Sequence, residues 1–445
     1  MTKVMIVDAG ARGHALARTY LSSDSVDEVI VTPGNEGIER NLIERSNRRM
    51  ENLSINKSSK LKDPDSILSV AQKHKPDLIE VAQDDALAVG TVDLLEKEGF
   101  RVFGPTRAAA QIEWDKVWSR EFMTRHKIPT PEYKAFRSGD NAIKYALGLL
   151  ERHKTVFFKA AGLYAGKGVV PAHDRETVEQ ALAAMKQMGP AGETFIVESG
   201  LVGEEFSYYA IVDGKNFLCF KSAQDNKRIW NKDQGPNTGG MGCNSPALVT
   251  KGLVSKIEQE IIAPAVKGLA EEGRPYKGIL YLGGILCDDG SLNVVEFNSR
   301  WGDPECHVIL PGIDKKAGHD YFCLVNAAIA GIINETMLKE DDVTRVCIVG
   351  ASAGYPGKYE KGKRVWIDHN SLPKTAHLLS AAIHIKDGKM YTAGGRVFSV
   401  VGTGNDVIEA RRNALQGMAC CSIEDNGLHY RTDIAWRDAE REQVT

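Results

Sequence analysis

The stretch VEFNSRWGDPE, residues 295–305, gathers side chains that can perform chemistry at the end of an apolar run, LNVV. Glu296 and Asn298 are separated by one residue, so on a β-strand their side chains leave the same face. A carboxylate and an amide oxygen side by side suit Mg²⁺ (or Mn²⁺), which completes its octahedron with nucleotide phosphates. Arg300 lies on that face if the strand continues, and can neutralise a phosphate that the ion does not reach. The alternative is a solvated strand end with an Asx turn, but LNVV has the character of a buried strand, so a metal site is predicted.

A second candidate stretch is FFKAAGLYAGKGVV at residues 157–170. It begins with an apolar strand that carries Lys159 and leads into a glycine-rich segment. This segment holds a further lysine among three glycines: Gly162, Gly166, Lys167 and Gly168. Because glycines permit positive φ and remove Cβ atoms, backbone N–H groups can converge on phosphate oxygens while lysines supply charge. A glycine-rich turn with solvated lysines explains this stretch alone equally well. It matches neither GxxxxGK(S/T) nor GxGxxG, so the P-loop and dinucleotide motifs do not apply.

The most polar segment, SAQDNKRIWNKDQGPNTGGMG at residues 222–242, has little to bury and four glycines in its last eight residues. Loops of this length are usually functional or disordered. Asp225, Lys227 and Arg228 stand at its start, and it lies between a predicted hairpin and a predicted helix. These features favour a loop that faces a substrate over a disordered one.

Carboxylates follow the strand-like run TFIV: Glu198 at its end, then Glu204 and Glu205. In a hinge between two lobes such groups can accept hydrogen bonds from ribose hydroxyls, although each alone is more often a surface glutamate. Near the N-terminus, DAGARGHA is only a GxxG pattern. We interpret it as a tight strand-to-helix turn whose helix N-terminus favours phosphate.

Several elements must position these residues. To about Pro105, strand-like runs that end in Gly, Pro or Asp alternate with helices, which predicts an open parallel α/β sheet with ligands beyond its carboxyl ends. A charged helix, AAAQIEWDKVWSREFMTRH, follows and is ended by Pro129 and Pro131. Turns at residues 213–214 and 288–290 predict two hairpins, and a β-rich pattern begins at about Thr344.

The predicted fold class is therefore a multidomain protein with α/β and α+β parts. We expect an N-terminal open parallel α/β domain at residues 1–105 and a β-rich C-terminal domain at residues 338–445. Between them, residues 106–337 form the domain that carries the candidate site.

The composition excludes several classes of protein. The 445 residues carry a formal net charge of −3 with 26% charged and 42% hydrophobic residues, which argues against nucleic-acid or membrane partners. The eight cysteines show no CxxC pair, and the N-terminus lacks the apolar run of a signal peptide. We expect a cytoplasmic protein, a monomer or weak homodimer, whose partners are small-molecule substrates.

The order of the motifs along the chain resembles a known superfamily. Lys116, Lys159 with its glycine-rich flap, Glu198, GPNTGGMG and EFNSRWGDPE follow one another as in ATP-grasp proteins. Within that superfamily the whole chain resembles the glycinamide ribonucleotide synthetase family, with GPTRAAAQIEWDK, RHKIPTPEY, GGRVFSVVG and YRTDIAWRDAERE as further matching stretches. The resemblance implies an ATP-grasp domain at residues 106–337 with a mobile lid at about residues 128–198. It also implies a ligase that phosphorylates the carboxylate of glycine with ATP. The amine of 5-phosphoribosylamine then displaces phosphate and forms an amide.

The resemblance also implies roles for individual residues. Glu296 and Asn298 are expected to hold the metal ion. The catalytic residues are expected to be Arg300, Lys159 and Asp303. Contacts with ATP are expected from Lys116, Lys159, Gly166, Lys167, Gly168, Glu198, Leu201 and Glu205. Contacts with the two other substrates, an amino acid and a phosphorylated amine, are expected from Gly10, Arg12, Asn35, Asp225, Lys227, Arg228, Asn237, Thr238, Asp303 and Pro304.

Departures from the family pattern are concentrated on the substrate side. Gly13 replaces a Glu, Asn226 replaces a His, and His307 stands where Gln, Glu or Thr is usual. Other positions that differ are Ala82, Gln83, Asp84, Trp114, Asp115, Ala161, Tyr164, Trp301 and the run Ser380–Ala382. A buried group left without its partner costs roughly 1 to 3 kcal/mol, so these changes can alter the pocket for the amine and the amino acid.

Three functions are consistent with this pattern. The first is a divergent purine-pathway ligase with compensating substitutions. The second is a paralogue that joins another carboxylate to another amine. The third is a nucleotide-binding regulator without ligase activity, against which Arg300, Asp303 and Glu305 argue, because binding alone does not need them.

Overall fold

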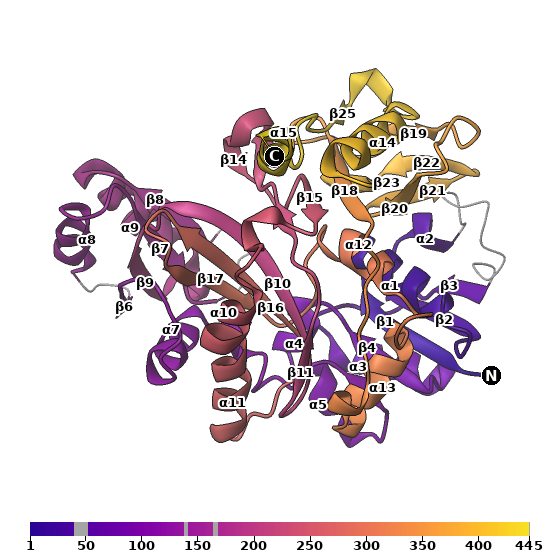
Figure 1. Ribbon diagram of the computed structural model, residues 1–445, viewed down its shortest axis with the longest axis horizontal. Helices are drawn as coiled ribbons and strands as arrows, with labels where there is room; N and C mark the ends of the chain where they lie inside the picture. Colours follow the sequence, from indigo (N-terminus) through magenta and orange to yellow (C-terminus); the bar gives the residue numbers. More distant parts are fainter. Residues whose placement is uncertain (40–51, 138–140, 163–167, 445) are drawn as a thin grey trace.

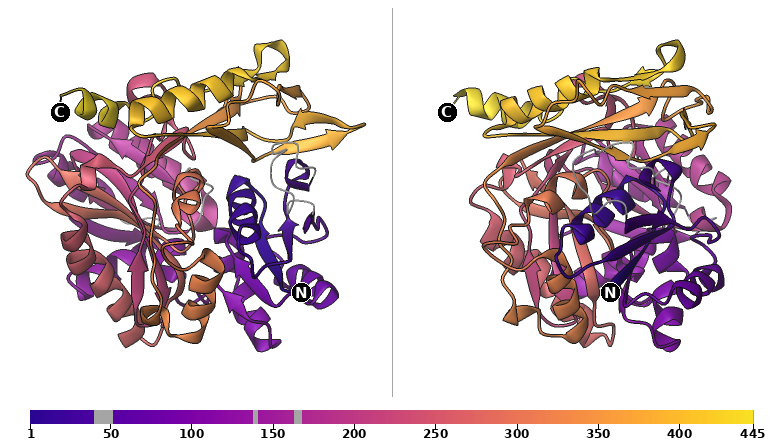
Figure 2. Two further views of the ribbon diagram at one scale, coloured as in Figure 1. Left: turned by 45° about the vertical axis from the view of Figure 1, so that its right-hand side comes forward. Right: turned by 90° about the vertical axis from the view of Figure 1, so that its right-hand side faces the viewer.

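The computed structural model describes residues 1–39, 52–137, 141–162 and 168–444. Its strands form a parallel sheet near the N-terminus and antiparallel sheets in the middle and C-terminal parts of the chain. In Figure 1 the N-terminal part (indigo) lies at the lower right and the segment around residue 180 lies at the left. The C-terminal part (gold) forms a layer across the top of the other parts, as the views in Figure 2 show.

The N-terminal part is an open parallel sheet in the order β3-β2-β1-β4-β5, as predicted. The strands are β1 (Lys3–Asp8), β2 (Glu28–Pro33), β3 (Leu53–Ile55), β4 (Leu78–Val81) and β5 (Val102–Phe103). The helices are α1 (Ala11–Leu21), α2 (Glu36–Glu39), α3 (Pro64–His74), α4 (Asp84–Ala88) and α5 (Thr91–Lys97). The carboxyl ends of β1 and β4 run directly into the turns before α1 and α4, so these turns lie side by side at one edge of the sheet.

Strand β4 carries a buried carboxylate. Glu80 is 2% exposed and accepts hydrogen bonds from the hydroxyls of Tyr20 at 2.6 Å and Tyr321 at 3.0 Å. Trp301 Nε1 donates to the hydroxyl of Tyr321 at 3.0 Å. This network ties the N-terminal sheet to the segment that follows Asn298. Burial raises the pKa of Glu80 to about 7, although both tyrosine hydrogen bonds act to lower it.

Replacement of Glu80 by Gln should change how stability depends on pH. In the folded protein Glu80 holds its proton to about pH 7, whereas the unfolded chain releases it near 4.5. Stabilisation by the protonated carboxyl is thus complete below about pH 4.5 and is lost as the pH rises through 7. Between pH 5 and pH 8 the parent should lose on the order of 3 kcal/mol relative to Glu80→Gln. Thermal midpoints of the two proteins, compared at both pH values, measure this. Parallel pH profiles would contradict the assignment.

The segment after β5 was predicted to be one long helix, and this is wrong. It forms α6 (Gln111–Trp114) and α7 (Lys116–Arg125), which are separated at Asp115. Asp115 is extended (φ −126°) and its carboxylate caps α7 by accepting from Trp118 N at 3.0 Å. The backbone N–H of Lys116 donates to Ala161 O at 3.0 Å. The break therefore brings Lys116 to the end of the strand that carries Lys159.

The segment predicted to be a lid contains a four-stranded antiparallel sheet in the order β6-β9-β7-β8. Its strands are β6 (Tyr133–Arg137), β7 (Val156–Ala160), β8 (Val169–Ala172) and β9 (Thr194–Ser199). Two helices, α8 (Ala142–Leu150) and α9 (Arg175–Gln187), pack on one face through a core that includes Phe158 and Phe195. Lys159 and Glu198 alternate with those core residues, so they lie on the opposite face.

The second antiparallel sheet has the order β11-β10-β16-β17 and contains both predicted hairpins. The strands are β10 (Gly203–Asp213), β11 (Phe217–Cys219), β16 (Lys277–Cys287) and β17 (Leu292–Asn298). The helical segments that accompany it are α10 (Val254–Ile257), the π-helix η5 (Glu258–Ile262), α11 (Ala263–Glu271), α12 (Cys306–Ile309) and α13 (Tyr321–Ala330).

The polar segment at residues 222–242 was predicted to be a loop, but it contains strands. β12 (Gln224–Asp225) and β15 (Gly242–Ser245) pair with each other, and β13 (Arg228–Trp230) pairs with β14 (Gln234–Asn237). β15 also pairs with β18 (Thr344–Ser352), so the segment joins a sheet of the C-terminal part. The predicted domain boundaries stay a prediction. Because β12 and β15 belong to a sheet of the C-terminal part, a division of the chain at residue 337 would not separate the sheets.

The C-terminal part is β-rich, as predicted. Its larger sheet adds β20 (Ala376–Ser380), β23 (Arg396–Gly404) and β25 (Leu428–His429) to β12, β15 and β18. A smaller sheet has the order β21 (Ile383–Lys386), β22 (Lys389–Thr392), β19 (Arg364–Ile367) and β24 (Cys421–Ile423). The helices are α14 (Val407–Ala419) and α15 (Trp436–Val444). Within the described ranges no helix combines the length and apolar character needed to cross a membrane.

Candidate active site

A β-bulge turns Glu296 toward the site. In the β16–β17 ladder Gly283 pairs with Glu296 and Gly284 pairs with Val294, so Val295 is an extra residue. Val294 and Phe297 consequently both point into the same hydrophobic core, although three positions separate them. Glu296 and Asn298 lie on the other face, as predicted. Without the bulge Glu296 would share the core face with Val294, because side chains alternate along a strand.

The Glu296 carboxylate lies in a strongly positive environment. Burial alone would raise the pKa of Glu296, but the charges of Lys227, Lys116, Lys159 and Arg300 lower it. Among the described residues, none forms a hydrogen bond or an ion pair within 4 Å with this carboxylate, so its oxygens are available to a ligand. Lys116 has a lowered pKa because it is buried and because Lys159 is near, while Glu296 acts in the opposite direction.

Arg300 follows the strand and is held in a fixed orientation. One terminal nitrogen contacts Glu113 Oε1 at 2.9 Å and Asn298 Oδ1 at 3.2 Å, and the other donates to Trp301 O at 3.3 Å. Its Nε and the Asn298 Nδ2 are buried without a hydrogen-bond partner in the described structure. These two donors can bind an anionic group.

Arg120 on α7 connects the sheet β6-β9-β7-β8, called the lid sheet below, to the bulge at Val295. The sequence analysis did not assign this role. Its guanidinium contacts Glu198 Oε2 at 2.8–2.9 Å, and it donates to Val294 O at 3.2 Å and Val295 O at 2.7 Å. The other Glu198 oxygen pairs with Lys159. Both Glu198 oxygens are thus occupied. The predicted contact of Glu198 with adenosine stays a prediction.

We expect Arg120→Met to destabilise the protein strongly. Removing Arg120 leaves one buried oxygen of Glu198 without its partner, while Lys159 stays paired with the other oxygen. Loss of one partner of a buried ion pair costs roughly 3–5 kcal/mol. Arg120 and Glu198 are 3% and 2% exposed, and the two bulge carbonyls also lose their donor. Thermal midpoints of Arg120→Met and of the control Arg125→Met, whose partner Glu272 is at the surface, measure the effect. A similar shift in both variants would contradict a special role of Arg120.

The remaining residues predicted to contact ATP come from several segments of the chain. Gly166 and Lys167 lie outside the described residues. Gly168 is buried, and its carbonyl accepts from Ala160 N at 2.8 Å at the end of β7. Leu201 lies between β9 and β10, and Glu205 pairs with Lys227 at 3.0 Å.

Two motifs that are far apart in sequence pack against each other on the substrate side. Gly240, in GPNTGGMG, has φ +109°, and a Cβ atom there would lie 2.6 Å from Pro304 Cδ and 2.9 Å from Asp225 Oδ1. Only glycine fits this backbone and this gap. Asp225 Oδ1 is buried without a partner in the described structure. Burial and the charge of Glu305 raise the pKa of Asp225. Its carboxyl can thus act as a hydrogen-bonding group toward a substrate.

Asp303 lies over the N-terminus of α1. A Cβ atom on Gly10 would lie 3.5 Å from Asp303 Oδ2, and the Arg12 backbone donates to this carboxylate. Arg396, which the sequence analysis missed, contacts Asp303 Oδ1 at 3.2 Å and its carbonyl at 2.7 Å. Burial opposes ionisation, yet Arg396, His307 and Arg12 lower the pKa of Asp303 to about 2.

The other predicted substrate residues make hydrogen bonds within the protein. Arg228 and Asn237 are exposed partners in the β13–β14 hairpin, where Arg228 donates to Gly235 O at 2.7 Å. Thr238 Oγ1 donates to Lys227 O at 2.8 Å. Asn35 contacts Ala9 O at 3.3 Å and Ser380, which links β20 to the N-terminal part.

Two of the unusual residues have structural roles. Asn226 Oδ1 accepts from Ala435 N at 3.1 Å and therefore points toward the C-terminal segment. His307 is completely buried, with Nδ1 at 3.6 Å from Cys347 Sγ and Nε2 at 3.8 Å from Asp303 Oδ1. Asn226 thus serves the fold, whereas His307 lies behind Asp303.

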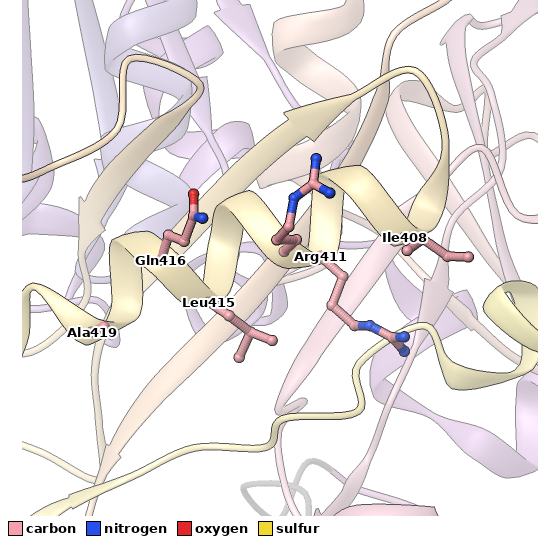
Figure 3. A pocket seen from close by; sticks show the side chains of 6 residues that line it. Ile408, Arg411, Leu415, Gln416 and Ala419 are labelled. Atoms are coloured by element: carbon pink, nitrogen blue, oxygen red, sulfur yellow. The ribbon is translucent and has the colours of Figure 1, made fainter.

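In the described residues, neither a surface depression on α14 nor a cluster of metal-ligating side chains offers an alternative to this site. A depression on the outer side of α14 is lined by Ile408, Arg411, Leu415 and their neighbours (Figure 3), and it contains none of the predicted residues. The described residues contain no group of three or more His, Cys, Asp or Glu side chains that can hold a metal ion. A divalent ion at Glu296 and Asn298 would thus need further oxygen ligands from a bound substrate.

The fold is that of ATP-grasp enzymes. Biotin carboxylase from Campylobacter jejuni, solved as a β-γ-ATP complex, aligns with 96% of this chain and 93% of its own at a TM-score of 0.71. Its sequence is only 14% identical, so this likeness shows the fold alone.

The chain belongs to the phosphoribosylglycinamide synthetase family. Models of that family's N domain, ATP-grasp (A) domain and C domain match residues 2–113, 114–306 and 345–437. Phosphoribosylamine–glycine ligase of Caldanaerobacter subterraneus subsp. tengcongensis is 38% identical over 97% of this chain and 99% of its own. The ligase of Salmonella typhi is 38% identical over 99% of this chain and 100% of its own. The crystal structure of the Thermotoga maritima ligase aligns at a TM-score of 0.78 with 28% identity and covers 97% of this chain and 100% of its own.

Proposed function

We propose that this protein is an ATP-dependent carbon–nitrogen ligase that joins glycine to 5-phosphoribosylamine. The products are glycinamide ribonucleotide, ADP and phosphate. Family membership over the whole chain supports this function, and one observation carries the chemistry. The carboxylate–amide pair Glu296 and Asn298, turned outward by the bulge, lies among the charges of three lysines and Arg300.

The residues of this site suit phosphoryl transfer, which depends on positioning and charge neutralisation more than on a covalent nucleophile. Glu296 and Asn298 would hold Mg²⁺ or Mn²⁺, which supplies charge neutralisation at the phosphates when bound. Lys116 and Lys159 would bind the phosphates of ATP, and Leu201 and Glu205 would line the adenosine site. Arg300, with its unpartnered Nε, would bind the phosphoryl group as it moves to glycine.

On the substrate side, the charged and amide groups at the carboxyl ends of β1 and β4 face the segment 300–305. Gly10 and Arg12 would bind the phosphorylated amine, and Asp303 would orient its amino group against the acyl phosphate. Asp225 would complete the pocket. Closure of the lid sheet over the nucleotide would exclude water and so protect the acyl phosphate from hydrolysis. The acting species would be a monomer or weak homodimer.

Measurement of ADP release tests the proposal. We expect ATP turnover to depend on glycine and phosphoribosylamine together, and mass spectrometry of the product should show glycinamide ribonucleotide. Turnover with other pairs of amine and carboxylate only would replace this function with that of a paralogue. ATP binding without turnover under all these conditions would contradict a ligase.

A further inference from the structure

Asp8 is a buried carboxylate at the carboxyl end of β1, and it was not among the predicted site residues. Its side chain is 0% exposed. Oδ2 accepts from Arg12 Nε at 2.8 Å, while Oδ1 accepts from the backbone N–H groups of Gly10 at 2.6 Å and Gly13 at 3.0 Å. Both oxygens therefore bind the turn that opens α1.

Arg12 is the side chain that this carboxylate holds. Its guanidinium is 6% exposed and also donates to Trp301 O at 3.0 Å and to Gln83 Oε1. It thus joins the ends of β1 and β4 to the segment after β17. The charges of Arg300 and Asp303 act on it as well, so it lies among the groups proposed to bind substrate.

Asp8 explains why residue 13 is glycine. A Cβ atom on Gly13 would lie 3.0 Å from both Cβ and Oδ1 of Asp8, and 3.2 Å from Val31 Cγ1. Both distances to Asp8 are tighter than ordinary contacts, so a side chain at residue 13 would require Asp8 to shift by a few tenths of an ångström. Where a glutamate is usual in the family at residue 13, this chain thus has glycine, with the carboxylate of Asp8 on β1 directly beside that position.

We propose that Asp8 is the positioning residue for Arg12, and that it takes the place of the glutamate usual in the family at residue 13. The inference rests on the proposed function, in which Arg12 faces the phosphorylated amine. A charge-assisted hydrogen bond to a buried carboxylate fixes the guanidinium plane. Its loss would misplace Arg12, and a displacement of about 1 Å can cost roughly 100-fold in rate.

The first test is Asp8→Asn, which keeps the shape but removes the charge. We expect KM for the amine to rise at least roughly tenfold, whereas KM for ATP stays within about twofold, because Arg12 serves only the amine. The control is Asp77→Asn, an exposed residue at the amino end of β4 whose carboxylate accepts from the backbone N–H of Lys3. It should leave both KM values unchanged. An unchanged amine KM in Asp8→Asn, or equal changes for ATP, would overturn the proposal.

The second test moves the carboxylate from residue 8 to residue 13. Asp8→Gly and Gly13→Glu should each reduce kcat/KM, the first by loss of the Arg12 partner and the second by collision with Asp8. In the double variant the collision is absent and a carboxylate is restored, so kcat/KM should exceed the product of the single effects by roughly tenfold. A double variant no better than that product would overturn the replacement of one carboxylate by the other.

A crystal structure of Asp8→Asn provides a readout that does not depend on the reaction. We expect the Arg12 guanidinium to leave the carbonyl of Trp301. An Arg12 that keeps its position would overturn the positioning role. If the parent shows no turnover with glycine and phosphoribosylamine, the proposed function fails, while this structural comparison still decides the role of Asp8.

Discussion

Replacement of Glu296 by Gln should lower kcat/KM for ligation by roughly 10³-fold, which corresponds to a loss of several kcal/mol in transition-state stabilisation. Gln keeps the size of the side chain but removes the negative charge that Lys116, Lys159 and Lys227 surround. In the proposed metal site it also replaces a carboxylate oxygen with a weaker amide oxygen. Because the bulge turns this side chain away from the core, the fold should tolerate the change.

Two measurements separate the metal ligand from a general electrostatic effect. The Mg²⁺ concentration for half-maximal rate should rise at least roughly tenfold in Glu296→Gln. The control Asp289→Asn lies at the turn of the same β16–β17 hairpin, where its carboxylate contacts only Ser291, and it should leave both quantities unchanged. A Glu296→Gln enzyme with normal kcat/KM and normal Mg²⁺ dependence would remove the basis of the proposed mechanism.

Local signals predicted the elements that local residues determine. The alternation of strands and helices gave the parallel N-terminal sheet, and the turns at residues 213–214 and 288–290 gave the two hairpins. The break at Asp115 had a readable signal too, because an aspartate before a charged run is a good N-cap. The charged segment after residue 105 was nevertheless predicted as one continuous helix that ends at the prolines.

Features that depend on distant partners could not be predicted. The strands within residues 222–242 form because β15 pairs with β18, about a hundred residues later, and a polar sequence alone gives no sign of that partner. The extra residue Val295 is a β-branched residue in a β-branched run, so only the ladder opposite reveals the bulge. Alternation correctly placed Glu296 and Asn298 on one face, yet it could not show that this face lies opposite the core.

The missed site residues share one property: each is a charged side chain held in place by tertiary contacts. Arg120 belongs to a helix rich in charges, where an arginine is usually solvated, and Arg396 follows two glycines in a predicted strand. Asp8 offered a signal, because a carboxylate that ends a fully apolar strand needs partners when it is buried. The sequence analysis assigned Arg12 as a substrate residue but did not identify the residue that pairs with it, so Asp8 was missed.

Replacement of Arg300 by Lys should lower kcat by roughly 10³-fold or more. In other phosphoryl-transfer enzymes, an arginine that stabilises the charge of the transferred phosphoryl group contributes a factor of this size. The guanidinium uses its two terminal nitrogens for Glu113, Asn298 and Trp301 and still has a buried Nε–H free for a ligand. A lysine ammonium is a single point of charge, and it cannot make this set of contacts and also reach a phosphoryl oxygen.

The expected change is confined to kcat if Arg300 acts in the transition state, so KM for ATP should stay within about threefold. Arg364→Lys is the matched control, since that arginine lies over the exposed Trp366 in the C-terminal part and should tolerate the same exchange. Thermal midpoints verify that both variants are folded. Because Glu113 also accepts from the backbone and hydroxyl of Ser299, its position should survive the loss of Arg300. An Arg300→Lys enzyme that retains kcat within tenfold would show that this arginine serves the fold of the 298–305 segment and that another cation meets the phosphoryl group.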